Sequence, residues 1–393
     1  MQSKHLVTQK MQTTVPRAGA KLSPLDPRDV ILDHVIQELI VSSGQTPASL
    51  ASNVNQAKTE CKLFATHNDI TRDPHDGLRK PVSLFDQGQT SMCVASTCAT
   101  IMNLQQGIFN VNPYFVYNCR DSQQHDDGMP VKNCMAIAYR YGAPTFSNYP
   151  VHQTQTNPNG QPHIQVTPTT LENAKKQRFM GYGRVMSLQT AIDLFQLNAC
   201  DRYKDKFGGL FFVLPVRNGS PRFWAWSPVQ SVMGEDDDNA SIVGYHCITV
   251  LDVDIEQKVF KLQNSWGVNW GNYGCTYFPF EDWIEYVQEC WFATCSEEIA
   301  NLIKTQVQKL NTFQNMGNGD LNPNSRQNVV YNMSTLNKEM NYPSQQPAKS
   351  STATTAATPP RCKQSSPSMI DPFLNTVQDA FQLISRLMPK PNN

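Results

Sequence analysis

The 393-residue sequence lacks the long apolar segments that mark membrane-spanning or exported proteins. Its first 22 residues contain no continuous apolar core of a secretory signal, and no stretch reaches the roughly 18 apolar residues of a membrane span. An excess of charge is missing as well, because 33 basic and 33 acidic residues cancel. This balance gives no support for general binding to nucleic acid or to an anionic membrane. We therefore expect no membrane span and no nucleic-acid partner.

A zinc-type cysteine pattern is also missing. The 11 cysteines show no sequential CxxC spacing that indicates a metal site. The acidic run Glu235–Asp238 is interpreted as a solvated loop, so the sequence predicts no metal and no cofactor. Without a secretory signal, the cysteines are interpreted as reduced thiols. The predicted location is the cytoplasm or the inside of an assembled particle such as a virion.

One cysteine is distinguished by the residues around it. Cys93 follows a polar, glycine-bearing loop at 84–91 and precedes VASTCATIMN, whose small and apolar residues recur at helical spacing. The sequence predicts Cys93 at a helix N-terminus, where the macrodipole and unpaired backbone N–H groups favour a thiolate. Gln87 lies six residues earlier and can turn its amide toward the cysteine. This amide and the Cys93 N–H could hold a developing oxyanion, as acyl transfer requires.

A thiolate nucleophile needs a proton acceptor, and the acceptor needs a group that fixes its tautomer. His246 lies in SIVGYHCITVLDVD, which has the pattern of a buried strand. Asn264 lies in KVFKLQNSWGVNWGNYGCTYFPF, which has the pattern of a strand pair. The order Cys, His, Asn, with the histidine about 150 residues after the cysteine, is typical of papain and cathepsin cysteine peptidases.

With these motifs the chain resembles the papain-like, cathepsin-type cysteine peptidases over roughly residues 69–297. It is most similar to the signal-less, short-prosegment branch of bacteria, archaea and viruses, where DQGQ at this distance from the cysteine is usual. The resemblance implies an α+β fold with a helical lobe, a β-rich lobe and an active-site cleft between them. By position, Cys93 resembles the nucleophile, His246 the general base, Asn264 the residue that orients the imidazole, and Gln87 the oxyanion-hole glutamine.

Five further residues match substrate-binding positions of the family. Gly128, Met129 and Pro130 resemble the glycine and apolar pair that line the main specificity pocket, so an apolar pocket is expected. Trp266 resembles the indole that shields the hydrogen bond between the asparagine and the histidine from water. Trp270 resembles the second tryptophan of the same NSWG-x-x-WG motif, which is highly specific to the family.

The residues just before the nucleophile depart from the family pattern. Thr90, Ser91 and Met92 stand where the family usually has Cys, Gly and Ser, so its local disulfide is not expected. Ser91 and Met92 add bulk on the floor of the cleft. They could narrow or re-aim the substrate groove.

The chain is divided into four predicted segments: an N-terminal extension or short prosegment at 1–68, a catalytic domain at 69–312, a flexible linker at 313–368 and an amphipathic helix at 369–393. In the first segment, Asp26 and Pro27 predict the start of a helix, which either covers the cleft or packs permanently on the domain. The C-terminal helix is expected to bind a partner or another copy of the chain, with folding back onto the domain as the alternative.

The predicted function is a cysteine endopeptidase that acts on proteins or peptides through an acyl-enzyme on Cys93. Two alternatives stay open at this point. The first is a catalytically weak or inactive papain-fold protein with a binding or structural role, whose cleft Ser91 and Met92 spoil. The second is a transpeptidase-type acyl transferase, because the same residues would support transfer to an amine in place of water.

Overall fold

The computed structural model describes residues 18–42, 76–120, 128–150, 167–199, 203, 206–217 and 242–316, except 27 and 77. All of them belong to one of the two compact units into which the chain divides. The predicted C-terminal helix at 369–393, nearly all of the predicted linker and the acidic run at 235–238 lie outside the described residues.

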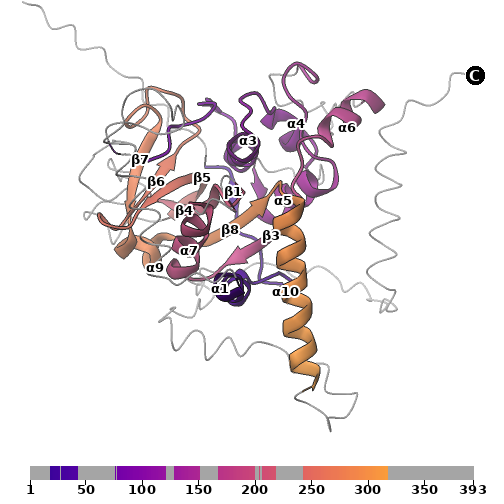
Figure 1. The fold of residues 1–393 in the computed structure, drawn as a ribbon. Coiled ribbons are helices and arrows are strands. Elements are labelled where there is room, and N and C mark those ends of the chain that lie inside the picture. The colour runs from indigo at the N-terminus through magenta and orange to yellow at the C-terminus, as the bar shows by residue number, and fades with distance from the viewer. Residues whose placement is uncertain are drawn as a thin grey trace, which may run out of the picture. The chain divides into compact units, whose positions relative to one another are not determined.

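Strands from distant parts of the chain form one sheet of eight strands in the order β2-β1-β5-β4-β8-β3, with β6 paired to β5 and β7 to β6 (Figure 1). Among the strand pairs that the structure describes, β1–β2 is parallel and the others are antiparallel. The apolar runs LFFVL in β4 and CITVL in β5 suit strands that are covered on both faces. The bounds are β1 Ala20–Lys21, β2 Met129–Pro130, β3 Gly181–Val185, β4 Leu210–Arg217, β5 Ile242–Asp254, β6 Val259–Gln263, β7 Cys275–Pro279 and β8 Glu289–Thr294.

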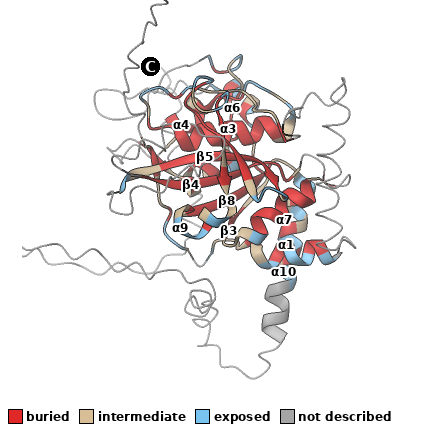
Figure 2. Ribbon diagram, turned by 90° about the vertical axis from the view of Figure 1, so that its left-hand side faces the viewer, coloured by how far each residue is buried: buried red, intermediate tan, exposed pale blue. Residues whose placement is uncertain are grey.

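Helices cover both faces of this sheet. In Figure 2, α3, α4 and α6 lie above it, and α7, α1 and α10 lie below it. The predicted α+β fold, with a helical part and a β-rich part, is confirmed. The helices are α1 Leu32–Ser42, α3 Cys93–Gln106, α4 Pro113–Asn118, α5 Val131–Arg140, α6 Pro168–Ala174, α7 Leu188–Asn198, α9 Trp283–Tyr286 and α10 Glu297–Met316, with a 3-10 turn, η2, at Phe280–Asp282.

Helix α3 is the central helix of the upper layer. It packs on β5 below it and on α4 and α5 beside it, so its residues 93–104 are all buried. Small side chains such as Ala95 and Ser96 allow this close packing on several sides. The helix ends at Gly107, whose φ of 63° lies in the left-handed region that glycine adopts without strain. The predicted extent of this helix is therefore confirmed.

The N-terminal helix begins later than the sequence predicts. It was expected to start at Pro27, with Asp26 as its cap, but α1 starts at Leu32. Asp26 Oδ1 accepts the backbone N–H of Arg28 at 2.9 Å, as a helix cap would, and its Oδ2 binds Lys132 at 2.9 Å. Only a single turn forms there, however, and Ile31 forms a parallel β-bridge with Arg184. The bridge to Arg184 thus interrupts the helix after one turn, and α1 begins at the next residue.

Helix α1 is nevertheless part of the main hydrophobic core. It packs against α7, α10 and β3. Its apolar side chains belong to the same core cluster as residues of β4, β5 and β8; they are Leu32, Val35, Ile36, Leu39 and Ile40. Helix α10, which packs against α1, extends to Met316, past the boundary of the catalytic domain expected at 312. Among the residues described here, no helix combines the length and the apolar character needed to cross a bilayer.

Candidate active site

Cys93 is the first residue of α3, as the sequence predicts, and it is completely buried. The neighbouring strand β5 reaches its sulfur directly, because the backbone N–H of Cys247 donates to Cys93 Sγ at 3.4 Å. His246 is the residue immediately before Cys247 on this strand. The helix N-terminus and the strand thus bring the predicted nucleophile and the predicted base to one place.

His246 is held by Asn264 and covered by indole rings. Its Nε2 lies 2.7 Å from Asn264 Oδ1, and that oxygen also accepts the backbone N–H of Ser265 at 2.8 Å. Because Asn264 Oδ1 accepts, Nε2 carries the imidazole proton and Nδ1 carries the lone pair. The ring of Trp266 lies 4.5 Å from the imidazole, and Trp270 meets Trp266 edge-on at 5.6 Å. The hydrogen bond is therefore shielded from water.

Gln87 is fixed at both ends of its amide. Its Nε2 donates to Thr90 O at 2.6 Å, and its Oε1 accepts from Ser265 Oγ at 2.6 Å. The backbone is tied as well, since Gln87 N donates to Ser265 O at 2.8 Å. Ser265 directly follows Asn264 in the chain, so its hydrogen bonds hold Gln87 beside Asn264. This role of Ser265 was not predicted, although the residue lies inside the NSWG motif.

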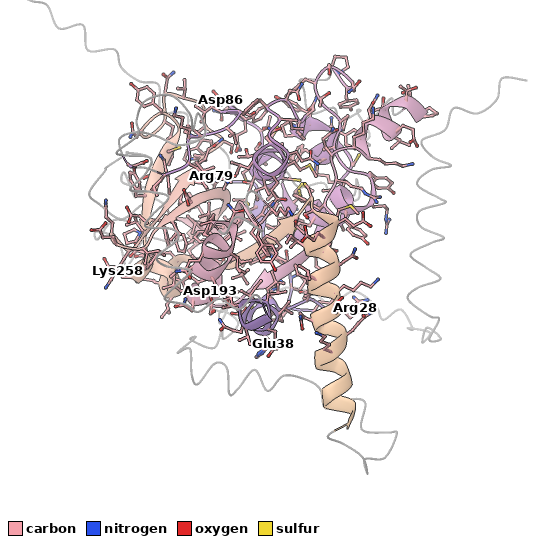
Figure 3. The ribbon with its side chains drawn as sticks, in the orientation of Figure 1. Arg28, Glu38, Arg79, Asp86, Asp193 and Lys258 are labelled. Carbon is pink, nitrogen blue, oxygen red and sulfur yellow. The ribbon has the colours of Figure 1, made fainter. Side chains whose placement is uncertain are left out.

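The loop that carries Gln87 is pinned to the NSWG loop by further backbone contacts. Asp86 pairs with Trp266 in an antiparallel bridge, and Gly267 N donates to Phe85 O at 3.2 Å. Figure 3 labels Asp86 at the top of the molecule, on the side where α3 lies. The two loops therefore form one rigid support for the predicted oxyanion and orienting groups.

A segment from the N-terminus lies across this site. We call Ala18–Lys21 the N-terminal strand. Its residue Ala20 pairs with Met129 of β2 in parallel and with Tyr245 of β5 in antiparallel register. It therefore bridges the helical side, which carries β2, and the β side, which carries His246. The backbone of Gly19 also reaches the Cys93 sulfur.

The predicted pocket residues are those that contact this strand. Met129 donates its backbone N–H to Gly19 O at 3.0 Å, and Pro130 pairs with Lys21. Gly128 has a φ of 98°, and a Cβ at this position would lie 2.2 Å from Gly19 O. In this structure the N-terminal strand thus occupies the place where the resemblance puts a substrate.

Buried charges hold the residues that follow the N-terminal strand. Arg184 Nη2 lies 3.4 Å from Asp29 Oδ2, and its Nη1 lies 3.8 Å from Glu289 Oε2. The backbone N–H of Ser23 donates to the Glu289 carboxylate. The Arg184 guanidinium also covers the ring of Trp291 at 4.2 Å. This cluster was not predicted; the sequence indicates it only through Arg184 and Glu289, charged residues within otherwise apolar strands.

Burial sets the protonation of the pair. It raises the pKa of the Cys93 thiol to about 11, against the opposing effect of backbone donors from Cys247 and Gly19. It lowers the pKa of His246 to about 4, against the opposing effect of the bond to Asn264. At neutral pH both groups are therefore uncharged. The expectation of a favoured thiolate is wrong for this covered state, because desolvation outweighs the helix N-terminus.

No protein-family model and no curated protein sequence matches this chain. Its structure is similar to that of xylellain, a cysteine protease from Xylella fastidiosa, with 18% identity over 71% of this chain and 96% of that one, at a TM-score of 0.46. It is also similar to a Carica candamarcensis cysteine protease (14% identity, 56% and 95% covered, TM-score 0.40) and to bromelain from Ananas comosus (14%, 55% and 94%, TM-score 0.40). What this site can do chemically follows from its own side chains.

Proposed function

We propose that this chain is a papain-like cysteine endopeptidase. The observation that carries the proposal is the hydrogen bond from His246 Nε2 to Asn264 Oδ1, which the ring of Trp266 covers. His246 lies on β5, the strand whose next residue, Cys247, donates its N–H to Cys93 Sγ. A buried histidine that served only the core would not need its tautomer fixed beside a thiol at a helix N-terminus. The placement among the signal-less relatives of bacteria, archaea and viruses remains a prediction from DQGQ.

The proposed reaction begins when the N-terminal strand leaves and water reaches the pair. His246 Nδ1 then takes the proton of Cys93, and the thiolate attacks the carbonyl carbon of a peptide bond. The oxyanion is held by the Cys93 N–H and by the second amide hydrogen of Gln87, whose first hydrogen binds Thr90 O. His246 gives its proton to the leaving amine, which leaves a thioester on Cys93. Water, deprotonated by His246, then releases the acid and restores the thiol.

We further propose that the N-terminal strand keeps the enzyme inactive, as a short prosegment would. The strand pairs with both sides of the site, in which Cys93 and His246 are fully buried and uncharged at neutral pH. Helix α1, by contrast, is buried in the main core and belongs permanently to the folded unit. The N-terminal strand would thus act as the prosegment that covers the site, and α1 would be the extension that packs permanently on the domain.

An inactive binding protein is the second candidate. Ser91 and Met92 are buried next to Cys93, and in this reading the N-terminal strand would occupy the site permanently in place of a substrate. Hydrolysis of fluorogenic peptides by full-length Gly19→Leu protein, in which the strand cannot seat, tests the two against each other. The peptidase proposal expects hydrolysis that Cys93→Ala abolishes without changing the melting temperature. Hydrolysis that persists in Cys93→Ala, or its absence from every form, would refute the proposal. Adding an amine acceptor separates hydrolysis from acyl transfer through the product mass.

A further inference from the structure

The N-terminal strand shows what kind of peptide fits over Cys93. Three consecutive small residues, Ala18, Gly19 and Ala20, fill the space between β2 and β5. A Cβ placed on Gly19 would lie 2.0 Å from Ser91 O, 2.4 Å from its carbonyl carbon and 2.6 Å from its Cα. These obstacles are backbone atoms, so no side-chain rotation makes room. The position on Ser91 admits glycine only.

The N-terminal strand also contacts the backbone on both sides of this space. Gly128 faces Gly19 O, where a Cβ on Gly128 would lie 2.2 Å away, and Gly244 faces Ala18, where a Cβ on Gly244 would lie 2.9 Å from the alanine methyl. Both walls therefore already lack side chains at the contact. The strand still touches them, so the space is narrow because of the backbone itself.

Ser91 has little freedom to move aside. It is 3% exposed, and the next residue, Met92, is fully buried ahead of α3. The loop before it is closed by hydrogen bonds in which Thr90 N and Thr90 Oγ1 both donate to Gln87 O. Moving Ser91 would thus disturb the residue assigned to the oxyanion. The bulk that the sequence places at 91 and 92 is fixed in the floor of the site.

We propose that the site takes peptides with glycine at the residue that rests on Ser91, and with small residues such as alanine on either side. This inference rests on the proposed peptidase function. Gly19 lies on Ser91, two residues before Cys93 at the start of α3, so the residue on Ser91 is taken to be the one beside the attacked bond. Recognition then comes from backbone pairing with Met129 and Tyr245, while selectivity comes from the exclusion of side chains.

The test compares fluorogenic peptides that differ only in the residue before the leaving group: Gly, Ala, Leu or Phe. Full-length Gly19→Leu protein should prefer glycine to leucine by about 100-fold in kcat/KM. Adding Ser91→Gly removes the serine side chain but leaves the obstructing Ser91 backbone atoms in place, so it should leave that ratio unchanged. A fall to about tenfold or less would show that the side chain excludes larger residues and would overturn the argument from the backbone. Ser147→Gly is the matched control, since Ser147 is exposed and outside the site, and it should keep the ratio.

A second measurement needs no opened variant and no folded Ser91→Gly protein. Wild-type chain is treated with peptidyl vinyl sulfones that end in Gly or Leu, and the rate of Cys93 modification is followed by mass spectrometry. Faster modification by the glycine reagent supports the inference. Equal rates, or a preference for leucine, overturn the inference and leave the peptidase proposal standing. If no reagent modifies Cys93 and no peptide is cleaved by any form, the peptidase proposal itself fails.

Discussion

Replacing Gly19 by leucine should convert the full-length chain from a covered to an open enzyme. The change places a side chain where a Cβ alone would lie 2.0 Å from the Ser91 carbonyl oxygen. With this side chain, the N-terminal strand cannot pack on Ser91 and pair with β2 and β5. Helix α1 and the Arg184 cluster do not involve residue 19, so the rest of the fold should remain.

The size of the effect follows from what the seated strand gains. Gly19 O accepts from Met129 N at 3.0 Å, and Ala20 is buried and pairs with both Met129 and Tyr245. Two or three hydrogen bonds at about 1 kcal/mol each, with about 1 kcal/mol for the buried methyl, total about 3 to 4 kcal/mol. Such a loss shifts the ratio of covered to open enzyme by roughly 100- to 1,000-fold.

The assay is the initial rate of hydrolysis of a glycine-ending fluorogenic peptide by equal amounts of wild-type and Gly19→Leu protein. The variant should be faster by up to the same factor. Leu25→Ala is the control, because Leu25 belongs to the same N-terminal segment but is 59% exposed, and it should behave as wild type. Equal rates for wild type and Gly19→Leu, with both active, would show that the strand does not cover the site in solution.

Three further predictions concern the pair and the C-terminus. In the Gly19→Leu background, Asn264→Ala should lower kcat roughly 10- to 100-fold and less than Cys93→Ala does, because Trp266 still positions the imidazole; a loss equal to that of Cys93→Ala would mean that Asn264 has another role. Burial lowers the pKa of His246 to about 4 from 6.5, so this group does not destabilise the covered state above pH 6.5 but destabilises it by up to about 3 kcal/mol as pH falls toward 4. The melting temperature of wild type should therefore fall more steeply over this window than that of Gly19→Leu, whereas parallel curves would contradict it. Deleting 369–393 should leave hydrolysis and melting temperature unchanged and abolish self-association or partner co-purification; a large fall in melting temperature would place the segment in the core.

The parts of the site that lie in continuous motifs could be predicted from the sequence. Cys93 at the start of α3 follows from a loop and a helical pattern that are adjacent in the chain, and Asn264 and Trp266 come within one motif. The structure brings them together with His246 and Gln87 through strand β5 and two pinned loops. Their chemical roles remain a proposal.

The parts that were missed depend on contacts between distant residues. Nothing local in Ala18–Lys21 indicates pairing with Tyr245, more than 200 residues away. Asp26 caps a single turn through the Arg28 N–H, but the bridge between Ile31 and Arg184 interrupts it, and the helix starts at Leu32. The thiolate expectation failed for the same reason, because the burial that raises the pKa of Cys93 comes from segments that are distant in the sequence, such as strand β5.

The most direct measurement is the mass mapping of an epoxide or vinyl-sulfone thiol reagent on full-length Gly19→Leu protein under native conditions. If Cys93 is an activated nucleophile beside His246, it should be modified first among the 11 cysteines, at a rate that falls sharply in His246→Ala. Wild type should react more slowly at the same position. Modification spread over other cysteines, or a Cys93 rate unaffected by His246→Ala, would contradict the proposed catalytic pair.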